Sequence, residues 1–274
     1  MPDSPNPIAW MDRDDILGVI FHPRSEDSPN RAARPAQELS IPVVSNVTVG
    51  ARFHAAGKED PVILFFHGNG EIVADYDPIA GFYTKRKVSF LPVDYRGYGR
   101  SKGTPTVTTM LQDAGTVFEF ARGWLARNGY TGRLLVMGRS LGSASALEVA
   151  SSHPDRVAGL IIDSGFAHVV PLLQRLGAEL TPEDIRHKDA LHQTDKIRSY
   201  KGPTLIIHGA MDQIIPFQDA RDLFAASASP SKKLLTIPDG DHNNLMLVGY
   251  NDYMAAVSNI AKQTTHQPER IRAG

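Results

Sequence analysis

Three residue types that together perform nucleophilic catalysis occur in the chain, in the order Ser140, Asp212 and His242. Ser140 is the centre of GRSLG (138–142), a G-x-S-x-G motif that follows an apolar run and opens a helical pattern. A tight strand-to-helix turn of this kind strains the serine backbone and lifts the hydroxyl clear of the sheet. Glycine is expected at both ends of the motif, because side chains there would collide. The motif predicts a nucleophile; the alternative is a helix N-cap serine between turn glycines.

A serine hydroxyl needs a base to remove its proton and a third group to orient that base. Asp212 lies in HGAMDQIIP (208–216), just past an apolar run, and His242 lies in the turn IPDGDHNNL (237–245). Both loops are predicted at the carboxyl ends of parallel strands, where open α/β sheets bind their ligands. These residues therefore predict a Ser140–His242–Asp212 triad, with Asp163 as the alternative acid.

The segment HGNGE (67–71) follows the first buried strand of the predicted core. Its main chain is expected to supply the N–H of Asn69 to an oxyanion hole, together with the N–H of Leu141 beside the nucleophile. The alternative is a glycine-rich turn with no chemical role. Arg139, at the variable position of the motif, is expected to be a structural or rim residue.

The elements that must position these residues are short apolar runs ended by Gly or Asp, as is typical of strands buried on both faces. They lie at 61–68, 87–99, 132–138, 156–165, 202–209 and 232–240. Between them are helical patterns, the clearest over 106–128, with apolar residues at spacings of three and four. This β-α rhythm predicts an α/β protein with a mostly parallel, doubly wound sheet.

The domain organisation is predicted as one α/β domain over residues 46–262. Residues 1–45 are expected to be an irregular, proline-rich arm, with a short helix within 8–21 packed on the domain surface. The long connection after Asp163 predicts a small lid at about 166–200 over the carboxyl ends of the strands. Residues 263–274 are expected to be a polar tail.

The composition argues against several classes of partner. The 274 residues carry 29 Lys+Arg and 30 Asp+Glu. The chain therefore lacks the basic excess that would indicate a nucleic-acid or membrane-surface partner. The chain has no cysteine, which excludes disulfides and thiol catalysis. It shows neither a long apolar span nor a secretory signal, so a cytoplasmic protein with no membrane span is expected.

No cofactor and no metal site is expected. His187 and His192 are five residues apart and would point to different sides of a helix, and the glycine-rich segments lack nucleotide-binding spacing. The oligomeric state stays open.

The combination of HGNG, DYRGYGRS, GRSLGS, HGxxDxxIP and GDHN resembles the α/β-hydrolase superfamily over roughly residues 45–262. It is most similar to small serine hydrolases of the abhydrolase-domain type, which include lipid and thioester hydrolases and border on serine aminopeptidase-like sequences. The resemblance implies the α/β-hydrolase fold and a serine hydrolase acting through the triad already described.

The expected reaction is hydrolysis of a carboxylic ester or thioester in a small-molecule acyl substrate, through an acyl-enzyme on Ser140. A peptidase or amidase is the alternative within enzymes, since the same triad serves amides. A non-catalytic binding module that kept the fold is the alternative from another class. A dehalogenase is set aside because that reaction needs a carboxylate nucleophile where this chain has Ser140.

Overall fold

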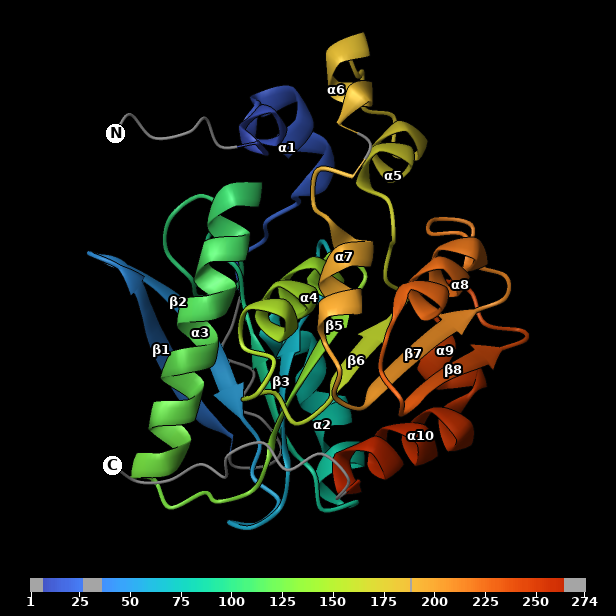
Figure 1. Ribbon diagram of the computed structural model, residues 1–274. Helices are drawn as coiled ribbons and strands as arrows, with labels where there is room; N and C mark the ends of the chain where they lie inside the picture. Colours follow the sequence, from blue (N-terminus) through green and yellow to red (C-terminus); the bar gives the residue numbers. More distant parts are fainter. Residues whose placement is uncertain (1–6, 27–35, 188, 264–274) are drawn as a thin grey trace.

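The computed structural model describes residues 7–26, 36–187 and 189–263. Within them, eight strands form a sheet in the order β1-β2-β4-β3-β5-β6-β7-β8 (Figure 1). The strands are β1 (Gln37–Val44), β2 (Val47–Phe53), β3 (Val62–Phe66), β4 (Ser89–Val93), β5 (Leu134–Arg139), β6 (Leu160–Asp163), β7 (Thr204–Gly209) and β8 (Lys232–Ile237). Strands β3 to β8 pair in parallel, and β1 and β2 join antiparallel. The expected mostly parallel sheet is confirmed.

Helices cover both faces of the sheet (Figure 1). In chain order they are η1 (Ala9–Asp12), α1 (Asp14–Ile20), η2 (Val73–Tyr76), α2 (Asp77–Thr84), α3 (Val107–Arg127), α4 (Gly142–Ser152), α5 (Val169–Arg175), α6 (Pro182–Arg186), α7 (Gln193–Ser199), α8 (Phe217–Ala226), α9 (Leu245–Val248) and α10 (Tyr250–Lys262). The helix predicted over 106–128 is therefore present as α3.

The doubly wound arrangement can be read from β3, all five residues of which are buried. Its alternate residues Val62, Leu64 and Phe66 belong to one hydrophobic cluster, and Ile63 and Phe65 belong to the other. Successive side chains of a strand point to opposite faces, so a strand between two helical layers must be apolar throughout.

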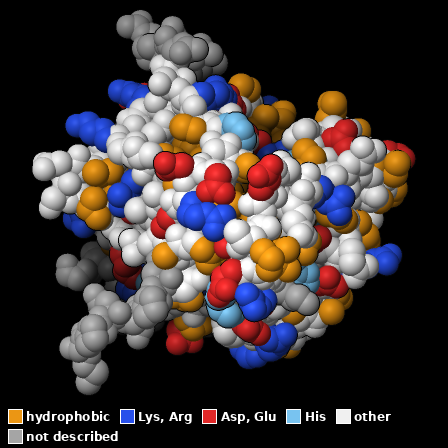
Figure 2. Space-filling view, turned by 90° about the horizontal axis from the view of Figure 1, so that it is seen from above, with side chains coloured by type: hydrophobic (Ala, Val, Ile, Leu, Met, Phe, Trp, Pro, Cys, Tyr) orange, Lys and Arg blue, Asp and Glu red, His pale blue; other side chains and the backbone are white. Residues whose placement is uncertain are grey.

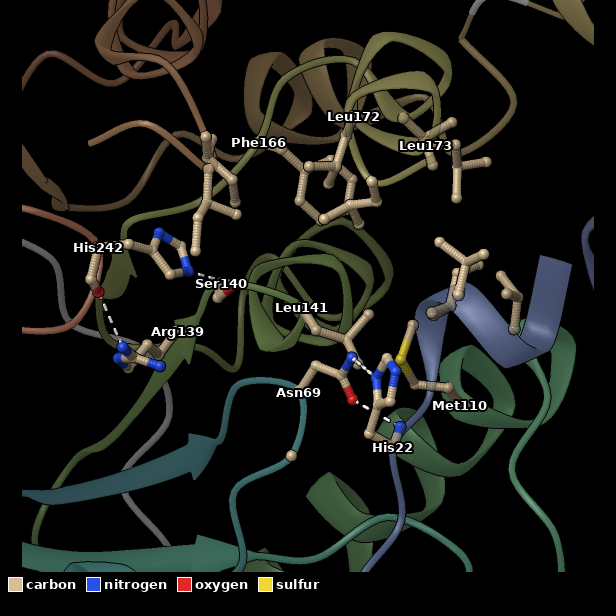
Figure 3. Close-up of a pocket in the computed structure, with 18 of the residues that line it drawn as sticks. His22, Asn69, Met110, Arg139, Ser140, Leu141, Phe166, Leu172, Leu173 and His242 are labelled. Atoms are coloured by element: carbon tan, nitrogen blue, oxygen red, sulfur yellow. Dashed lines mark hydrogen bonds between the residues drawn. The ribbon is translucent and has the colours of Figure 1, made fainter. Parts of the chain in front are cut away.

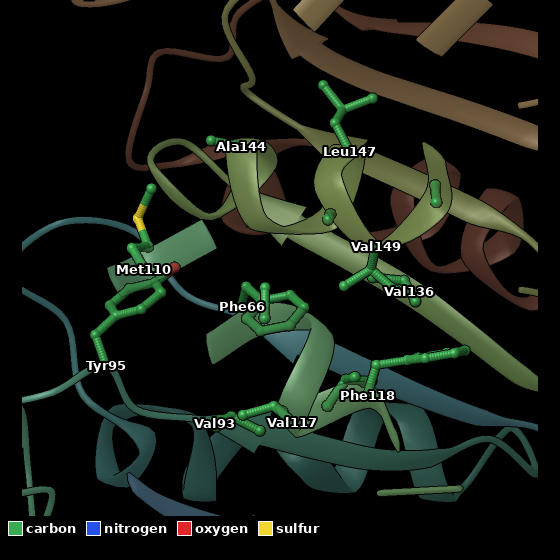
Figure 4. Packing of buried hydrophobic residues seen from close by; sticks show 14 of the residues in the cluster. Phe66, Val93, Tyr95, Met110, Val117, Phe118, Val136, Ala144, Leu147 and Val149 are labelled. Carbon is green, nitrogen blue, oxygen red and sulfur yellow. The ribbon is translucent and has the colours of Figure 1, made fainter. Parts of the chain in front are cut away.

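The larger cluster lies between the sheet and helices α3 and α4 (Figure 4). Phe66 and Val136 from neighbouring strands pack there with Val117 and Phe118 of α3 and with Val149 of α4. This packing fixes α4 against the centre of the sheet. The turn between β5 and α4, which carries Ser140, is thereby held in place.

The prediction of an irregular arm through residue 45 is wrong in its last part. Gln37–Val44 forms the edge strand β1, which pairs antiparallel with β2. Pro42 lies within this strand, beside a register shift between Pro42 and Val44. Proline lacks an N–H and is tolerated on edge strands and at bulges, so this proline does not end the strand. The short helix expected within 8–21 is present as α1.

Only part of the segment predicted as a lid lies above the sheet. Helices α5 and α6 lie at the top of the molecule, near α1, whereas α7 packs against α4 and α8 (Figure 1). Helix α7 is therefore the crossover helix that precedes β7. Seen from above, acidic, basic and hydrophobic side chains are interspersed on this end of the molecule (Figure 2). Of the predicted tail, residues 264–274 lie outside the described residues.

Candidate active site

The turn between β5 and α4 has the strained geometry that the G-x-S-x-G motif predicts. Ser140 has a φ of +51°, in the left-handed region that non-glycine residues rarely adopt. A Cβ placed on Gly138 would lie 2.1 Å from the carbonyl oxygen of Gly142. A Cβ on Gly142 would lie 2.1 Å from the carbonyl oxygen of Phe66 in β3. The expected collision at both glycines is confirmed.

The structure brings the three predicted triad residues into one hydrogen-bonded chain. The Ser140 Oγ lies 2.9 Å from the His242 Nε2, and the His242 Nδ1 lies 2.7 Å from the Asp212 Oδ2. Figure 3 shows the imidazole of His242 facing Ser140. The serine follows β5, the aspartate follows β7 and the histidine follows β8, so the three meet at one edge of the sheet. This order of contacts can carry a proton from a serine hydroxyl to an imidazole that a carboxylate orients.

The carboxylate of Asp212 is held on both of its oxygens. Its Oδ1 accepts hydrogen bonds of 2.9 Å from the N–H groups of Ile214 and Ile215. Its Oδ2 contacts His242, and also lies 3.3 Å from the Nε2 of His208. Burial raises the pKa of such a carboxyl, but hydrogen bonds from His208 and His242 outweigh it and hold the Asp212 pKa well below its usual 3.8. Asp212 is therefore a fixed, ionised partner for His242.

His208, at the end of β7, is a further contact of this site. Its Nε2 lies 2.8 Å from the carbonyl oxygen of Ile215. The same nitrogen also approaches Asp212. Burial lowers the pKa of His208, but the hydrogen bonds to Asp212 and to the Ile215 carbonyl, together with the nearby carboxylate charges, outweigh burial and raise the pKa from 6.5.

The alternative acid, Asp163, has other partners. Its Oδ2 accepts a hydrogen bond of 2.6 Å from the hydroxyl of Tyr253, and its Oδ1 accepts one of 3.0 Å from the Ser164 hydroxyl. Asp163 is buried at the end of β6, where these hydroxyls satisfy its carboxylate. The carboxylate that contacts His242 is that of Asp212.

The two residues predicted to form an oxyanion hole border the same cavity as Ser140. The main-chain N–H groups of Asn69 and Leu141 donate no hydrogen bond to any acceptor in the described part of the chain. The side-chain amide of Asn69 is fixed, because its Oδ1 accepts hydrogen bonds of 2.8 Å from the N–H of His22 and from the hydroxyl of Tyr98. The segment that carries the Asn69 N–H is therefore anchored next to the cavity.

Arg139 connects the nucleophile turn to the loop that carries His242. Its Nη2 donates a hydrogen bond of 2.8 Å to the main-chain carbonyl oxygen of His242 (Figure 3). The same nitrogen donates one of 3.1 Å to the Oδ1 of Asn243. Its Nη1 forms an ion pair with Glu71. Burial disfavours the charged guanidinium, but the Glu71 carboxylate, together with the nearby Tyr76, Asp163 and Tyr253, outweighs burial and raises the pKa of Arg139. Arg139, which was expected to be a structural or rim residue, thus binds the His242 loop through one nitrogen and Glu71 through the other.

Glu71 extends this connection to the oxyanion segment. Its Oε2 accepts hydrogen bonds of 2.6 Å from the main-chain N–H of Gly68 and from the hydroxyl of Tyr76. Gly68 directly precedes Asn69, so the Glu71–Arg139 pair joins the candidate oxyanion segment to the His242 loop. Sequence analysis missed this role of Glu71. The only available signal was the acid at the end of HGNGE, since the contact with Arg139 spans 68 residues.

An apolar cavity of about 400 Å³ opens beside Ser140 and His242 (Figure 3). Such a volume is in the range of small-molecule sites, about 300–1,000 Å³. The apolar side chains that line it come from η1, α1, α3, α5 and neighbouring segments: Met11, Val19, Ile20, Val107, Met110, Leu141, Phe166, Val169, Leu172, Leu173, Leu176, Leu191, Ile214 and Ile215. Among the described residues that line it, the two that carry a permanent charge are Glu71 and Arg139, which pair with each other.

One group of side chains in the described residues has the spacing of a metal site. Asp189, His192 and Asp195 bring their ligand atoms within 4.8 Å of one another. His192 and Asp195 are exposed, and Asp195 also pairs with Arg198. The group does not line the cavity at Ser140.

Comparisons with known proteins agree with this fold. A family model described as serine aminopeptidase, S33, matches residues 57–182. The protein YfhR of Escherichia coli is 29% identical over 184 residues, which cover 66% of this chain and 62% of YfhR. This chain thus spans less than two thirds of that relative. The uncharacterized membrane protein YNL320W of Saccharomyces cerevisiae is 31% identical over 237 residues, covering 82% of this chain and 80% of that protein.

Among solved structures, the esterase Pf2001 of Pyrococcus furiosus superposes with a TM-score of 0.71 at 18% sequence identity. The match covers 88% of this chain and 98% of the esterase. In the described residues, no helix combines the length and the apolar character that a membrane crossing needs. The strand order, the nucleophile turn and these matches together show that the chain belongs to the α/β-hydrolase superfamily.

Proposed function

We propose that the protein is a serine hydrolase that cleaves the carboxylic ester or thioester of an apolar acyl group. The observation that carries the proposal is the chain of hydrogen bonds from Ser140 through His242 to Asp212, at the edge of an apolar cavity. The strained φ of Ser140 adds to it, since backbone strain of this kind is concentrated at functional sites.

In the proposed reaction, the Ser140 Oγ attacks the acyl carbonyl carbon while the His242 Nε2 takes the hydroxyl proton. Asp212 stabilises the imidazolium cation, and the N–H groups of Asn69 and Leu141 stabilise the oxyanion. His242 then gives its proton to the leaving alcohol or thiol. A water molecule, activated by His242, releases the acid from Ser140 in the second half of the reaction.

The lining of the cavity favours an acyl chain over a peptide. An aminopeptidase must hold a charged amino group, which requires an acid that is free to bind it. Among the described residues, the acid that lines this cavity is Glu71, and Arg139, Gly68 and Tyr76 already bind its carboxylate. The rest of the wall is mainly Leu, Ile, Val, Met and Phe, which suit a hydrocarbon chain.

Reaction with a fluorophosphonate probe, measured by intact mass, tests the nucleophile. We expect a single adduct on the wild type and none on Ser140→Ala. A series of p-nitrophenyl esters, run beside peptide p-nitroanilides, then tests the substrate class, and we expect the esters to be the better substrates. Faster cleavage of the anilides would favour the peptidase. A folded wild type that forms no adduct and cleaves neither series would favour the binding module.

A further inference from the structure

The residues that line the cavity beside Ser140 range from exposed to fully buried. Two of its lining residues, Leu176 and Ile214, are 44% and 39% exposed. At the other extreme, Met11 is fully buried and Met110 is 4% exposed. A hydrocarbon chain loses contact with water only where the lining is buried, so the position of the buried lining residues limits the length of the chain.

Part of the buried lining comes from the N-terminal segment of the chain. Met11 comes from η1, and Val19 and Ile20 come from α1. Figure 3 shows α1 at the side of the cavity away from Ser140 and His242, with side chains of this helix turned into the cavity. These residues precede the segment 57–182 that the family model matches. They are therefore a feature of this chain that the matched segment does not contain.

Polar contacts fasten this segment to both sides of the site. Arg13 donates hydrogen bonds of 3.0 Å to both carboxylate oxygens of Asp184, in α6. The N–H of His22 donates to the side chain of Asn69, and the Arg24 Nε donates a hydrogen bond of 2.8 Å to the carbonyl oxygen of Gly70. A wall held at α6 and at the HGNGE segment cannot move away freely when the cavity fills.

We propose that η1 and α1 form the end wall of the acyl-binding cavity, and that Met11, Val19 and Ile20 determine the longest acyl chain that the enzyme accepts. This inference rests on the proposed function. Each methylene excluded from an apolar site lowers affinity about fourfold. Bulk added at the wall should therefore discriminate against long chains much more than against short ones.

The test compares Val19→Trp with Gly18→Trp, which places the same side chain on the same helix. Val19 is a partly buried lining residue, whereas a Cβ on Gly18 would have no atom within 4 Å. We expect Val19→Trp to lower the ratio of kcat/KM for p-nitrophenyl laurate to that for acetate about tenfold. We expect Gly18→Trp to keep the wild-type ratio.

A third variant, Ile20→Ala, is expected to shift the chain-length preference in the opposite direction. It keeps the proposal testable if Val19→Trp does not fold. Because it shortens a wall residue, it should raise the ratio for palmitate over laurate several-fold. If neither variant changed its ratio from the wild-type value, the proposal that η1 and α1 form the end wall would be overturned. An equal loss at every chain length in Val19→Trp would also overturn it, because that is the result of a purely structural role.

Binding separates failure of the end wall from failure of the proposed hydrolysis. Laurate affinity is measured by calorimetry in Ser140→Ala, alone and combined with Val19→Trp or Gly18→Trp. A tenfold loss of laurate affinity with Val19→Trp, and none with Gly18→Trp, would support the proposed end wall even if the wild type cleaved no ester. Equal affinities, or no binding of laurate at all, would overturn it even if the wild type cleaved short esters.

Discussion

The Nη2 of Arg139 donates a hydrogen bond of 2.8 Å to the main-chain carbonyl oxygen of His242. The residue directly before the candidate nucleophile thus holds the loop that carries the candidate base. Both residues line the apolar cavity and also a second cavity of about 520 Å³ between α2 and α10. We expect the position of the imidazole to depend on this contact, because it anchors the main chain of the His242 loop.

Replacement of Arg139 should therefore reduce turnover more than substrate binding. In Arg139→Gln, we expect kcat on the best ester to fall about 10²-fold with little change in KM, because small displacements of catalytic groups have effects of this size. Arg156→Gln is the matched control, since Arg156 forms an ion pair with Glu119 on the surface. An unchanged kcat in a folded Arg139→Gln would contradict the positioning role.

Loss of the nucleophile should abolish almost all turnover. We expect Ser140→Ala to lower kcat by a factor on the order of 10⁴ or more. Ser143→Ala is the control, because Ser143 is buried one turn away and makes no side-chain hydrogen bond within the described residues. The measurement is the steady-state hydrolysis of an ester that the wild type cleaves, and similar losses in both variants would exclude a special role of Ser140.

The two candidate acids can be separated by one pair of variants. Asp212→Asn should lower kcat on the order of 10⁴-fold, because an amide cannot hold His242 in the reactive tautomer. Asp163→Asn alters a hydrogen bond to Tyr253 and should lower the midpoint of thermal unfolding, with kcat within about tenfold of the wild type. The reverse ranking of the two kcat values would assign the acid to Asp163.

Stability should depend on pH in two windows with opposite signs. The pKa of Asp212 is lower in the folded protein than its ordinary 3.8, so its contribution is present above about pH 4 and is lost as the pH falls through the folded value. The pKa of His208 is raised from 6.5, so its contribution is complete below that pH and is lost as the pH rises through the folded value. Urea unfolding from pH 2 to 9 measures both slopes.

Asp212→Asn provides the control for these slopes. It removes the depressed carboxyl and also the main partner that raises the pKa of His208. We expect the acid-side loss of stability to become smaller and the alkaline-side loss to become shallower. A variant with both slopes of the wild type would show that other groups cause them.

The close packing at the nucleophile turn should make Gly142 intolerant of any side chain. Gly142→Ala places a Cβ against the carbonyl oxygen of Phe66, and we expect it to lower the free energy of unfolding by about 1–3 kcal/mol. Gly18→Ala, in an open part of α1, should raise the free energy of unfolding by up to about 1 kcal/mol. Chemical denaturation of both variants tests the contrast.

The sequence determined the features whose cause is local. Continuous apolar runs identified β3 to β7, because a strand between two helical layers has no polar face. The run that identified β8 is shorter, and this strand is partly exposed at the end of the sheet. The glycines of GRSLG identified the nucleophile turn, because a Cβ at either position would collide with main-chain atoms. Asp212 and His242 could be assigned because each follows a predicted strand, and the carboxyl ends of parallel strands meet at one edge of the sheet.

The tertiary structure decided the contacts between segments far apart in the chain. The pair of Glu71 with Arg139, the second histidine on Asp212 and the closure of the cavity by α1 have no periodic or spacing signal. The edge strand β1 was missed for a related reason. Its proline is tolerated because the strand lies at the edge of the sheet beside a register shift, and neither feature can be recognised from the sequence alone. Local propensity and periodicity specify elements, whereas such contacts depend on how the packed elements are placed against one another.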